Sequence, residues 1–482
     1  MTCRSVSRWR VVMAALAVGM LAACSQIRPE PISAAAGREL FHQRDLGSPY
    51  STGIPYALWL AAMERYPGPL GRDWDDFADR FGVVPHDGNP PGLPTGFVLH
   101  RDWLSGTDFL MTTCALCHHG TIGGQTIEGI GNRNLRLNAM NNAVMGVVAR
   151  EDFTEETMVP AAEAIAHTRG IPWDWRSTLA AKRAVRQLKV LAARNVELDS
   201  LDAGPGRNTP VEFTKAACNV PIEPPIGFVK FAAVWTYSKR RSFGWEGPFE
   251  GDLALAVSAV EFNKGMPPED ILAHRERWEA LYEYLKQLRP PRYPGSVDAV
   301  RAERGHALFL GVCSGCHGTY GPAEPAEYVE HIIPLAVVGT DPDRLRSITP
   351  QLVAARNRGE LGKLVHLVPR DGYVAVPLDG IWSRAPYLHN GAVPTLADLL
   401  RPARDRPVVF YVGADTGYDL DRLGLAYEED RLPDGTRAGR RASPKQYEFD
   451  TRAPGNRNGG HEFGTDLSAE DRQALLEYLK QL

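Results

Sequence analysis

Two short runs of cysteine and histidine have the residue types and spacing to do chemistry. Cys114–His118 reads C-A-L-C-H, and Cys313–His317 reads C-S-G-C-H. In a C-x-x-C-H run, two thiols on one helical turn can each add across a vinyl group of a haem. The adjacent histidine then lies under the iron as its proximal ligand. The sequence therefore predicts two covalently bound haem c groups.

The residues that would hold the haems follow directly from this spacing. A zinc site usually takes four ligands, often from cysteine pairs that lie close together, whereas these two runs are about 200 residues apart. A thioredoxin-like C-x-x-C belongs in a βαβ context, which neither run has. The remaining alternative is two unrelated pairs of reduced cysteines. The predicted attachment residues and proximal ligands are Cys114, Cys117 and His118 for the first haem, and Cys313, Cys316 and His317 for the second.

Length and composition limit the class of protein. A chain of 482 residues predicts two or three domains, and 44% hydrophobic residues suffice for a core. A net charge of −4 gives no reason to expect a nucleic-acid partner. Of the seven cysteines, four are assigned to haem and two belong to the N-terminal segment, so no disulfide framework remains.

Residues 1–24 are typical of an export signal, with three arginines followed by an apolar run that is too short to span a membrane well. Leu21-Ala22-Ala23-Cys24 resembles the bacterial lipoprotein box, which predicts acylation of Cys24. Ser25 follows instead of the aspartate that retains lipoproteins at the inner membrane. We therefore expect a periplasmic protein whose lipid anchor at Cys24 holds it to the outer membrane. The alternative is a plain signal peptide.

A repeat divides the rest of the chain. Residues 280–288 recur as residues 474–482 with eight of nine positions identical. The copies begin 166 and 161 residues after the first cysteine of their own C-x-x-C-H run. Landmarks repeated at nearly equal spans predict two duplicated modules. The predicted fold is mostly α, with two cytochrome c-like haem modules and long loops.

The predicted boundaries follow from the repeat and from proline. The first module covers residues 101–289 and the second residues 296–482, separated by a proline-rich linker that no helix can continue. Residues 25–100 are expected to form a leader and loops, with one short helix around Ala57 to Arg65. In the second module a helix from about Val297 places Gly305 where another helix could approach closely, and we expect the helix at 468–482 to pack there.

The second haem needs a sixth ligand if it only passes electrons. No methionine follows Met266, so the ligand of this module has to be another residue type. His461, in the glycine-rich loop before the last helix, is the first candidate. His389 is the second, with hydrogen bonding near a haem propionate as its alternative role, and His366 is a weaker third.

Three segments carry a resemblance to a known family: residues 242–247 (S-F-G-W-E-G), residues 386–391 (P-Y-L-H-N-G) and residues 464–468 (G-T-D-L-S). They resemble the bacterial diheme cytochrome c peroxidase superfamily, which includes the methylamine-utilisation diheme enzyme and the diheme rubber oxygenases. The likeness covers about residues 100–482. It is strongest in the second module, where the rubber-oxygenase-like branch is most similar.

The resemblance implies roles for individual residues. The first haem would be the reactive one, and the second would supply it with electrons through a tryptophan that matches Trp245. The family's match is imperfect, because Gly244 separates Phe from Trp and Glu246 replaces Asp. Glu261 would be the carboxylate beside the open haem face, with an exposed surface glutamate as the alternative. Trp245 has the alternative of a buried structural residue.

Met266 competes with an open first haem. It precedes the last helix of the first module, at the position where electron-transfer cytochromes place a distal methionine, so it could close the iron. The expected function is a diheme c-type cytochrome that activates peroxide or oxygen at the first haem and receives electrons from a redox partner protein. The alternatives are a purely electron-carrying cytochrome and an oxygenase that cleaves an apolar substrate.

Overall fold

The structure is a computed structural model that describes residues 32–47, 52–85, 92–194, 201–320, 327–431, 438, 439, 442 and 446–482. The export signal and Cys24 lie outside these residues. Helices make up about 43% and strands about 13% of the chain. The expectation of a mostly α fold is therefore corrected to a mixed one, because many loop segments pair as short antiparallel ladders.

The helices of the first part of the chain are α2 (Ala34–His42), α4 (Tyr56–Arg65), α5 (Pro67–Leu70), α6 (Trp74–Phe81), α7 (Ala115–His118), α8 (Leu137–Ala149), α9 (Glu155–Arg169), α10 (Trp175–Arg194), α11 (Pro210–Ala217), α12 (Leu253–Ala256), α13 (Ala259–Asn263), α14 (Pro268–Ala273) and α15 (Arg275–Leu285). Those that follow are α16 (Ala299–Val312), α17 (Ser314–His317), α18 (Leu335–Val338), α19 (Asp343–Arg346), α20 (Pro350–Arg356), α21 (Gly359–Leu364), α22 (Leu396–Leu399) and α23 (Ala469–Leu479). Among the described residues, no helix combines the length and apolarity needed to cross a bilayer.

The strands are short, and two of their groupings have three members. These are β1 (Ile54–Pro55), β3 (Asp108–Thr112) and β2 (Phe97–Arg101) in one sheet, and β15 (Glu428–Glu429), β12 (Val409–Gly413) and β16 (Gln446–Asp450) in another. The paired strands are β4 (His119–Ile122) with β5 (Gln125–Glu128), β6 (Arg207–Asn208) with β7 (Val229–Lys230), β8 (Phe249–Gly251) with β10 (Val365–Leu367), β9 (Ile332–Pro334) with β11 (Gly372–Val374), and β13 (Tyr418–Asp419) with β14 (Gly424–Leu425).

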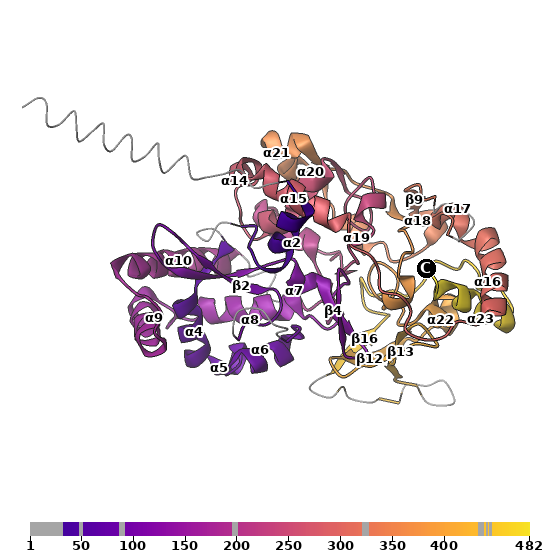
Figure 1. Ribbon diagram of the computed structural model, residues 1–482, viewed down its shortest axis with the longest axis horizontal. Helices are drawn as coiled ribbons and strands as arrows, with labels where there is room; N and C mark the ends of the chain where they lie inside the picture. The colour runs from indigo at the N-terminus through magenta and orange to yellow at the C-terminus, as the bar shows by residue number, and fades with distance from the viewer. Residues whose placement is uncertain are drawn as a thin grey trace, which may run out of the picture.

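Helices α16 and α23 cross at Gly305, as expected from the sequence (Figure 1). Asp298 caps α16 and accepts from the backbone amides of Val300 and Arg301. Ser468 caps α23 and accepts from the amide of Asp471. A Cβ atom at Gly305 would lie 2.0 Å from the carbonyl oxygen of Ala474. The two backbones therefore approach to a distance that only glycine permits.

The same crossing occurs between α2 and α15. A Cβ atom at Gly37 would lie 2.0 Å from the carbonyl oxygen of Ala280 and 2.7 Å from Cβ of Tyr284. Ala280 and Tyr284 are the residues that the sequence repeat aligns with Ala474 and Tyr478. Helix α2 thus makes with α15 the contact that α16 makes with α23, although it lies in the segment expected to be leader and loops.

The expectation that residues 25–100 form a leader and loops is corrected, because part of this segment belongs to a helical lobe. Helices α4, α5 and α6 fill much of this segment and pack with α8, α9 and α10 around a second apolar core. Figure 1 shows this lobe apart from α16, α17 and α23, with α2 and α15 between them. The helix expected around Ala57 to Arg65 is present as α4. The described residues between Gly37 and the first C-x-x-C-H run therefore include helices α4, α5 and α6 rather than only loops.

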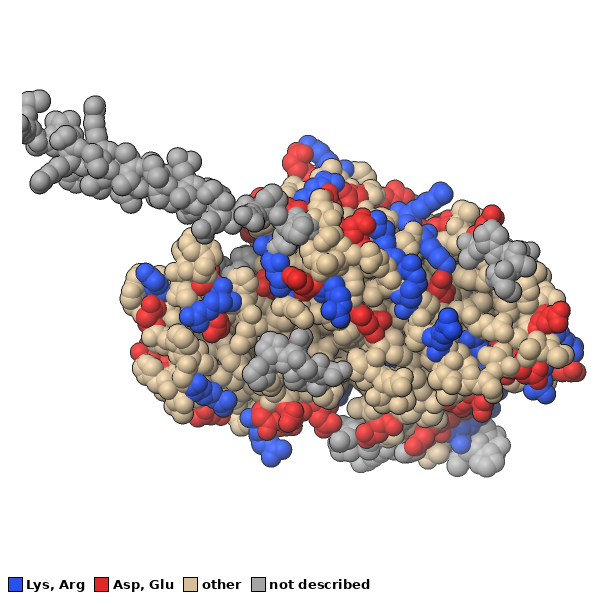
Figure 2. All heavy atoms as spheres, viewed as in Figure 1, with Lys and Arg blue, Asp and Glu red and all other residues tan. Residues whose placement is uncertain are grey.

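Basic and acidic side chains are interspersed over most of the face shown in Figure 2. Many form short-range pairs, such as Arg304 with Glu470 and Asp471 across the α16–α23 crossing. On the side chains that this view displays, charge of one sign is not concentrated over a broad area.

The glycine contact predicts opposite effects for one substitution at two sites of α16. Gly305→Ala should destabilise the protein by about 1–3 kcal/mol, because the added methyl group meets backbone. Gly311→Ala is the matched control, since a Cβ there meets nothing within 4 Å. It should stabilise the helix by about 0.5–1 kcal/mol. Denaturant or thermal unfolding measures both, and an equal response at the two sites would contradict the crossing.

Candidate haem-binding sites

Each C-x-x-C-H run forms one turn of helix with the same internal hydrogen bonds. In α7 the amide of His118 donates to the carbonyl of Cys114 over 3.0 Å, and that of Cys117 donates to the same carbonyl over 3.3 Å. In α17 the corresponding distances to the carbonyl of Cys313 are 3.0 and 3.2 Å. The two motifs therefore hold their cysteines and histidine in one shared geometry.

The thiols of these motifs are unpaired in the described residues, and burial changes their chemistry. Burial raises the pKa of Cys114, Cys117 and Cys313 to about 12. Redox-active C-x-x-C pairs and thiolate metal ligands have a depressed thiol pKa instead. The environment therefore argues against the alternative of a reactive dithiol and fits cysteines that end as thioethers.

Both proximal histidines are oriented by a backbone carbonyl. Nδ1 of His118 lies 3.0 Å from the oxygen of Ala232, and Nδ1 of His317 lies 2.8 Å from the oxygen of Val376. A proton on Nδ1 that is donated to a carbonyl leaves the Nε2 lone pair for a metal. Burial also lowers the pKa of His118 to about 4, so its imidazole is neutral, as a ligand must be. The residues present therefore fit a haem at each motif.

His461 faces His317 at a separation that fits an iron between them. The two ring centroids are 6.2 Å apart, with an interplanar angle of 45°. A metal bound at about 2 Å to one nitrogen of each ring would separate the centroids by roughly 6 Å. Nδ1 of His461 is buried and has no hydrogen-bond partner among the described residues. Burial, with His317 close by, lowers the pKa of His461 to about 4.

A tight loop fixes His461. Its amide donates to the carbonyl of Val338 over 2.6 Å, and its φ is 49°. At Gly460, whose φ is 73°, a Cβ would lie 2.2 Å from backbone carbon of Gly339. Backbone contact with the segment after α18, rather than helix geometry, therefore sets the position of this imidazole.

The other two histidines considered for this role lie elsewhere. His389 is buried and stacks on Tyr373, with ring centroids 4.0 Å apart. His366 is exposed on β10, and its Nδ1 lies 2.7 Å from the carbonyl of Gly362. The contact with His317 described above is made by His461.

Trp245 lies between the two backbone segments that orient the proximal histidines. Its Nε1–H donates to the carbonyl of Lys230 over 3.0 Å, and its own carbonyl accepts from the amide of Val374 over 2.9 Å. Lys230 is two residues before Ala232, and Val374 is two residues before Val376. A short path of backbone and hydrogen bonds therefore runs from His118 through Trp245 to His317.

A buried ion pair follows Trp245. Nε and Nη2 of Arg344 lie 2.9 and 2.7 Å from Oε1 of Glu246, and the two side chains are 6% and 0% exposed. The other carboxylate oxygen of Glu246 is buried without a partner in the described part of the chain. Arg344 thus joins the Trp245 segment to α19.

Glu261 is buried, so the alternative of an exposed surface glutamate is wrong. Its Oε1 lies 2.6 Å from Nζ of Lys264, which also donates to Oγ1 of Thr112 over 2.8 Å. Burial opposes the charge of Lys264, but Glu261 outweighs it and raises the pKa of the ammonium. The pair lies close enough to Cys114 to influence the pKa of its thiol. A carboxylate is therefore held near the first motif.

Met266 follows Glu261 closely and is only 1% exposed. Its amide donates to the carbonyl of Glu261 over 3.0 Å. Its side chain belongs to the large apolar core that also contains Ala115 of α7. Met266 is thus held close to Glu261 in the chain and in the same apolar core as the first motif.

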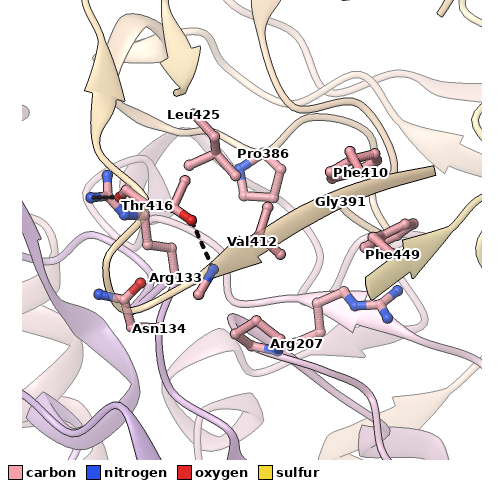
Figure 3. A pocket seen from close by; sticks show the side chains of 12 residues that line it. Arg133, Asn134, Arg207, Pro386, Gly391, Phe410, Val412, Thr416, Leu425 and Phe449 are labelled. Atoms are coloured by element: carbon pink, nitrogen blue, oxygen red, sulfur yellow. Dashed lines mark hydrogen bonds between the residues drawn. The ribbon is translucent and has the colours of Figure 1, made fainter. Parts of the chain in front are cut away.

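A narrow cavity lies where the two parts of the chain meet (Figure 3). Its volume of about 20 Å³ suits a single water, so it is not a substrate site. Arg207 lines this cavity, and its Cζ lies 4.4 Å from the ring centroid of Phe449. Its guanidinium also donates to the carbonyl of Asn390 over 3.2 Å. Figure 3 also shows Thr416 bonded to the backbone amide of Gly413 in β12.

Two features of the structure were not predicted from the sequence. The contact of α2 with α15 had a signal, because Gly37-Arg-Glu-Leu-Phe41 repeats the Gly, Leu and Phe of Gly305-His-Ala-Leu-Phe309. The Glu246–Arg344 pair had none, since nothing in the chain relates two residues so far apart.

Residues 372–411 match the model of the RoxA-like, cytochrome c-like family. The matched segment contains Val374 and Val376, which contact Trp245 and His317. The chain is also similar to the uncharacterized protein y4iJ of Sinorhizobium fredii, with 27% identity across 92% of this chain and 91% of that protein. A second similar protein, the uncharacterized y4iM of the same organism, is 29% identical across 58% of this chain and 70% of its own length.

These findings support a haem-binding redox protein with a cytochrome c-like domain. The match favours the rubber-oxygenase-like branch of the resemblance described above. It also agrees with covalent attachment of haem c through the C-x-x-C-H spacing.

Proposed function

We propose that this protein is a c-type cytochrome with two covalent haems that transfers electrons between them. The first haem would be held by Cys114, Cys117 and His118. The second would be held by Cys313, Cys316 and His317, with His461 as its sixth ligand. The matched backbone geometry of the motifs and the 6.2 Å separation of the His317 and His461 rings support this assignment.

The observation that carries the proposal is the position of Trp245. Its indole and its backbone carbonyl bond the segments whose carbonyls orient His118 and His317. Covalent and hydrogen bonds through Trp245 would therefore give an electron a continuous path between the haems at His118 and His317. Nζ of the buried Lys230 lies 5.5 Å from the centroid of the Trp245 ring, and burial lowers the pKa of this amine well below its usual value.

The sharper proposal is an oxidoreductase that activates peroxide or oxygen at the first haem. An open first haem held by His118 would supply the binding position for peroxide or oxygen, and the electrons for its reduction would come from the redox partner through the second haem. Glu261 would take a proton from the peroxide oxygen bound at that face and return it to the other oxygen, as a general acid–base group. Nζ of Lys264 lies 2.6 Å from Oε1 of Glu261 and would hold this carboxylate in place.

The burial of Met266 supports a second candidate, a purely electron-carrying cytochrome whose first haem is closed by this thioether. The family match supports a third, an oxygenase that cleaves an apolar substrate. Met266→Ala separates the first two candidates. In the electron carrier it should convert the first haem from low spin to high spin, whereas in the oxidoreductase this haem is already high spin and should not change.

Export, acylation of Cys24 and attachment to the outer membrane remain part of the proposal. Covalent haem c is attached outside the cytoplasm, which agrees with the signal in residues 1–24. A small redox protein would be the electron partner.

The direct test is the haem content and spectrum of protein exported in a host that attaches haem c. Two haems should survive acidified acetone and add their mass to the chain. Replacing Cys114 and Cys117 together by Ala should remove one haem, and replacing Cys313 and Cys316 should remove the other. A high-spin ferric haem beside a low-spin one supports the oxidoreductase, and two low-spin haems support the carrier.

Trp245→Phe tests the path. We expect reduction of the first haem by the second to become the slowest step, with both haem spectra unchanged, because the indole donor to Lys230 is lost. Rapid mixing of half-reduced protein measures the rate. Trp382→Phe is the control, because that buried indole donates to Pro291 in the linker. Trp235 donates its indole N–H to the carbonyl of Asp379. If Trp235→Phe slows the transfer and Trp245→Phe does not, the path runs through Trp235 instead.

A further inference from the structure

His42, His119 and Glu128 form a compact cluster outside the residues assigned to the haems. One ligand atom from each lies within 4.8 Å of the others. The rings of His42 and His119 have centroids 5.0 Å apart. Nε2 of His42 contacts a carboxylate oxygen of Glu128, and the hydroxyl of Tyr284 donates to the same oxygen.

Rigid elements from separate parts of the chain hold these groups. His119 and Glu128 are directly opposite each other in the β4–β5 hairpin, so their side chains share one face of the ladder. His42 stands in the last turn of α2. The Gly37 contact with Ala280 and Tyr284 fixes α2 on α15 and thereby sets His42 above the hairpin.

The surroundings combine an apolar wall with access from solvent. The ring of Phe41 packs edge-on against His42 and His119, with centroids 5.0 and 6.1 Å away. On the other side, a cavity of about 470 Å³ is lined by Glu128 and Tyr284 together with Arg38. The side chains of His42 and Glu128 are 13% and 32% exposed, so an ion could reach them.

We propose that His42, His119 and Glu128 bind a divalent transition-metal ion of the zinc type. Two imidazoles and one carboxylate are the donor set of open zinc sites, with water in the fourth position. Imidazole-rich sites favour such ions over calcium or magnesium, which take oxygen ligands. Tetrahedral ligands about 2.1 Å from zinc stand roughly 3.4 Å apart. Small side-chain rotations from the present spacing would therefore complete the site, with Tyr284 orienting Glu128 as an outer partner.

The site lies next to the first haem motif, because His119 follows His118 directly. A bound dication there would stabilise the reduced state of a nearby iron by Coulomb attraction. This effect rests on the proposed function: zinc should raise the midpoint potential of the first haem and leave that of the second unchanged.

The test uses the full haem-loaded protein after treatment with a chelator and gel filtration. Zinc is added in a calorimetric titration, and metal analysis then gives the zinc content of the desalted protein. We expect one zinc ion per chain. His42→Ala and Glu128→Gln should each weaken binding by more than the roughly 10- to 100-fold that loss of an outer partner costs, and Tyr284→Phe should fall within that range.

His100→Ala is the matched control, because this histidine pairs with a carboxylate of Asp45 at 2.9 Å and lies outside the cluster. It should bind zinc as the parent protein does. The proposal is overturned if the chelated protein takes up no zinc, or if His42→Ala and Glu128→Gln both bind zinc as tightly as the parent protein. Circular dichroism establishes that each variant is folded. Haem absorbance is read separately, so failure of haem attachment and failure of zinc binding are distinguishable.

Discussion

His461→Ala should convert the second haem from six-coordinate low spin to high spin and leave the first haem as it is. In the structure this imidazole is the group that faces His317, with ring centroids 6.2 Å apart. Alanine removes the whole imidazole, so an iron held between the two rings would lose one axial ligand. Electronic absorption and low-temperature EPR of the ferric protein would detect the change in one of the two haems.

Added imidazole should restore the low-spin spectrum of this variant, because the removed ring leaves room for it. His389→Ala is the matched control, since that buried ring stacks on Tyr373. It should keep the second haem low spin. If His389→Ala gives the high-spin product and His461→Ala does not, the assignment of the sixth ligand is wrong.

Arg344→Met should lower the free energy of unfolding by about 3–5 kcal/mol, because it leaves the Glu246 carboxylate buried without its cation. That carboxylate is fully buried, and Nε and Nη2 of Arg344 both contact its Oε1. A loss of this size is a large share of the roughly 5–15 kcal/mol that stabilises a folded domain. Denaturant unfolding followed by circular dichroism measures it.

Two further variants test whether the loss of stability in Arg344→Met comes from the unpaired buried charge. Glu246→Met combined with Arg344→Met removes both charges and should recover most of the loss, since neither ion then remains buried alone. Lys363→Met breaks an exposed pair with Glu360, whose side chains are 68% and 71% exposed, and should change nothing measurable. A small effect of Arg344→Met would mean that water reaches Glu246.

Local patterns in the sequence predicted the parts of the fold that depend on local physics. The position of Gly305 in the helix expected from about Val297 indicated a close crossing with the helix at 468–482, and this crossing is present. The helix expected around Ala57 to Arg65 rested on local composition alone, and it is present.

Features that depend on distant segments were not predictable in the same way. The strand pairing of β8 with β10 joins loops far apart in sequence, and short strands of two or three residues carry no alternation to read. Helix α2 was missed because its Gly37 lies 77 residues before the first motif. The corresponding glycine of α16 lies eight residues before its own motif, where the pattern is easy to recognise.

The candidate sites show the same division. The C-x-x-C-H runs and the loop position of His461 could be found from spacing, because a covalent haem needs its attachment residues close together. The burial of Glu261 and the contacts of Trp245 could not, since they depend on how Lys264, Lys230 and Val374 pack in the folded chain.

The contact between α2 and α15 has a consequence for how the protein is assembled. The two helices meet across 243 residues of sequence, whereas α16 and α23 meet across 169. Loop-closing contacts of such length form late in folding. In an exported, haem-binding chain as proposed above, the first cysteine pair would stay accessible to the attachment machinery until α15 has crossed the membrane. The contact of α15 with α2 would then complete the apolar core that α2 and α15 share with Ala115 of the first motif.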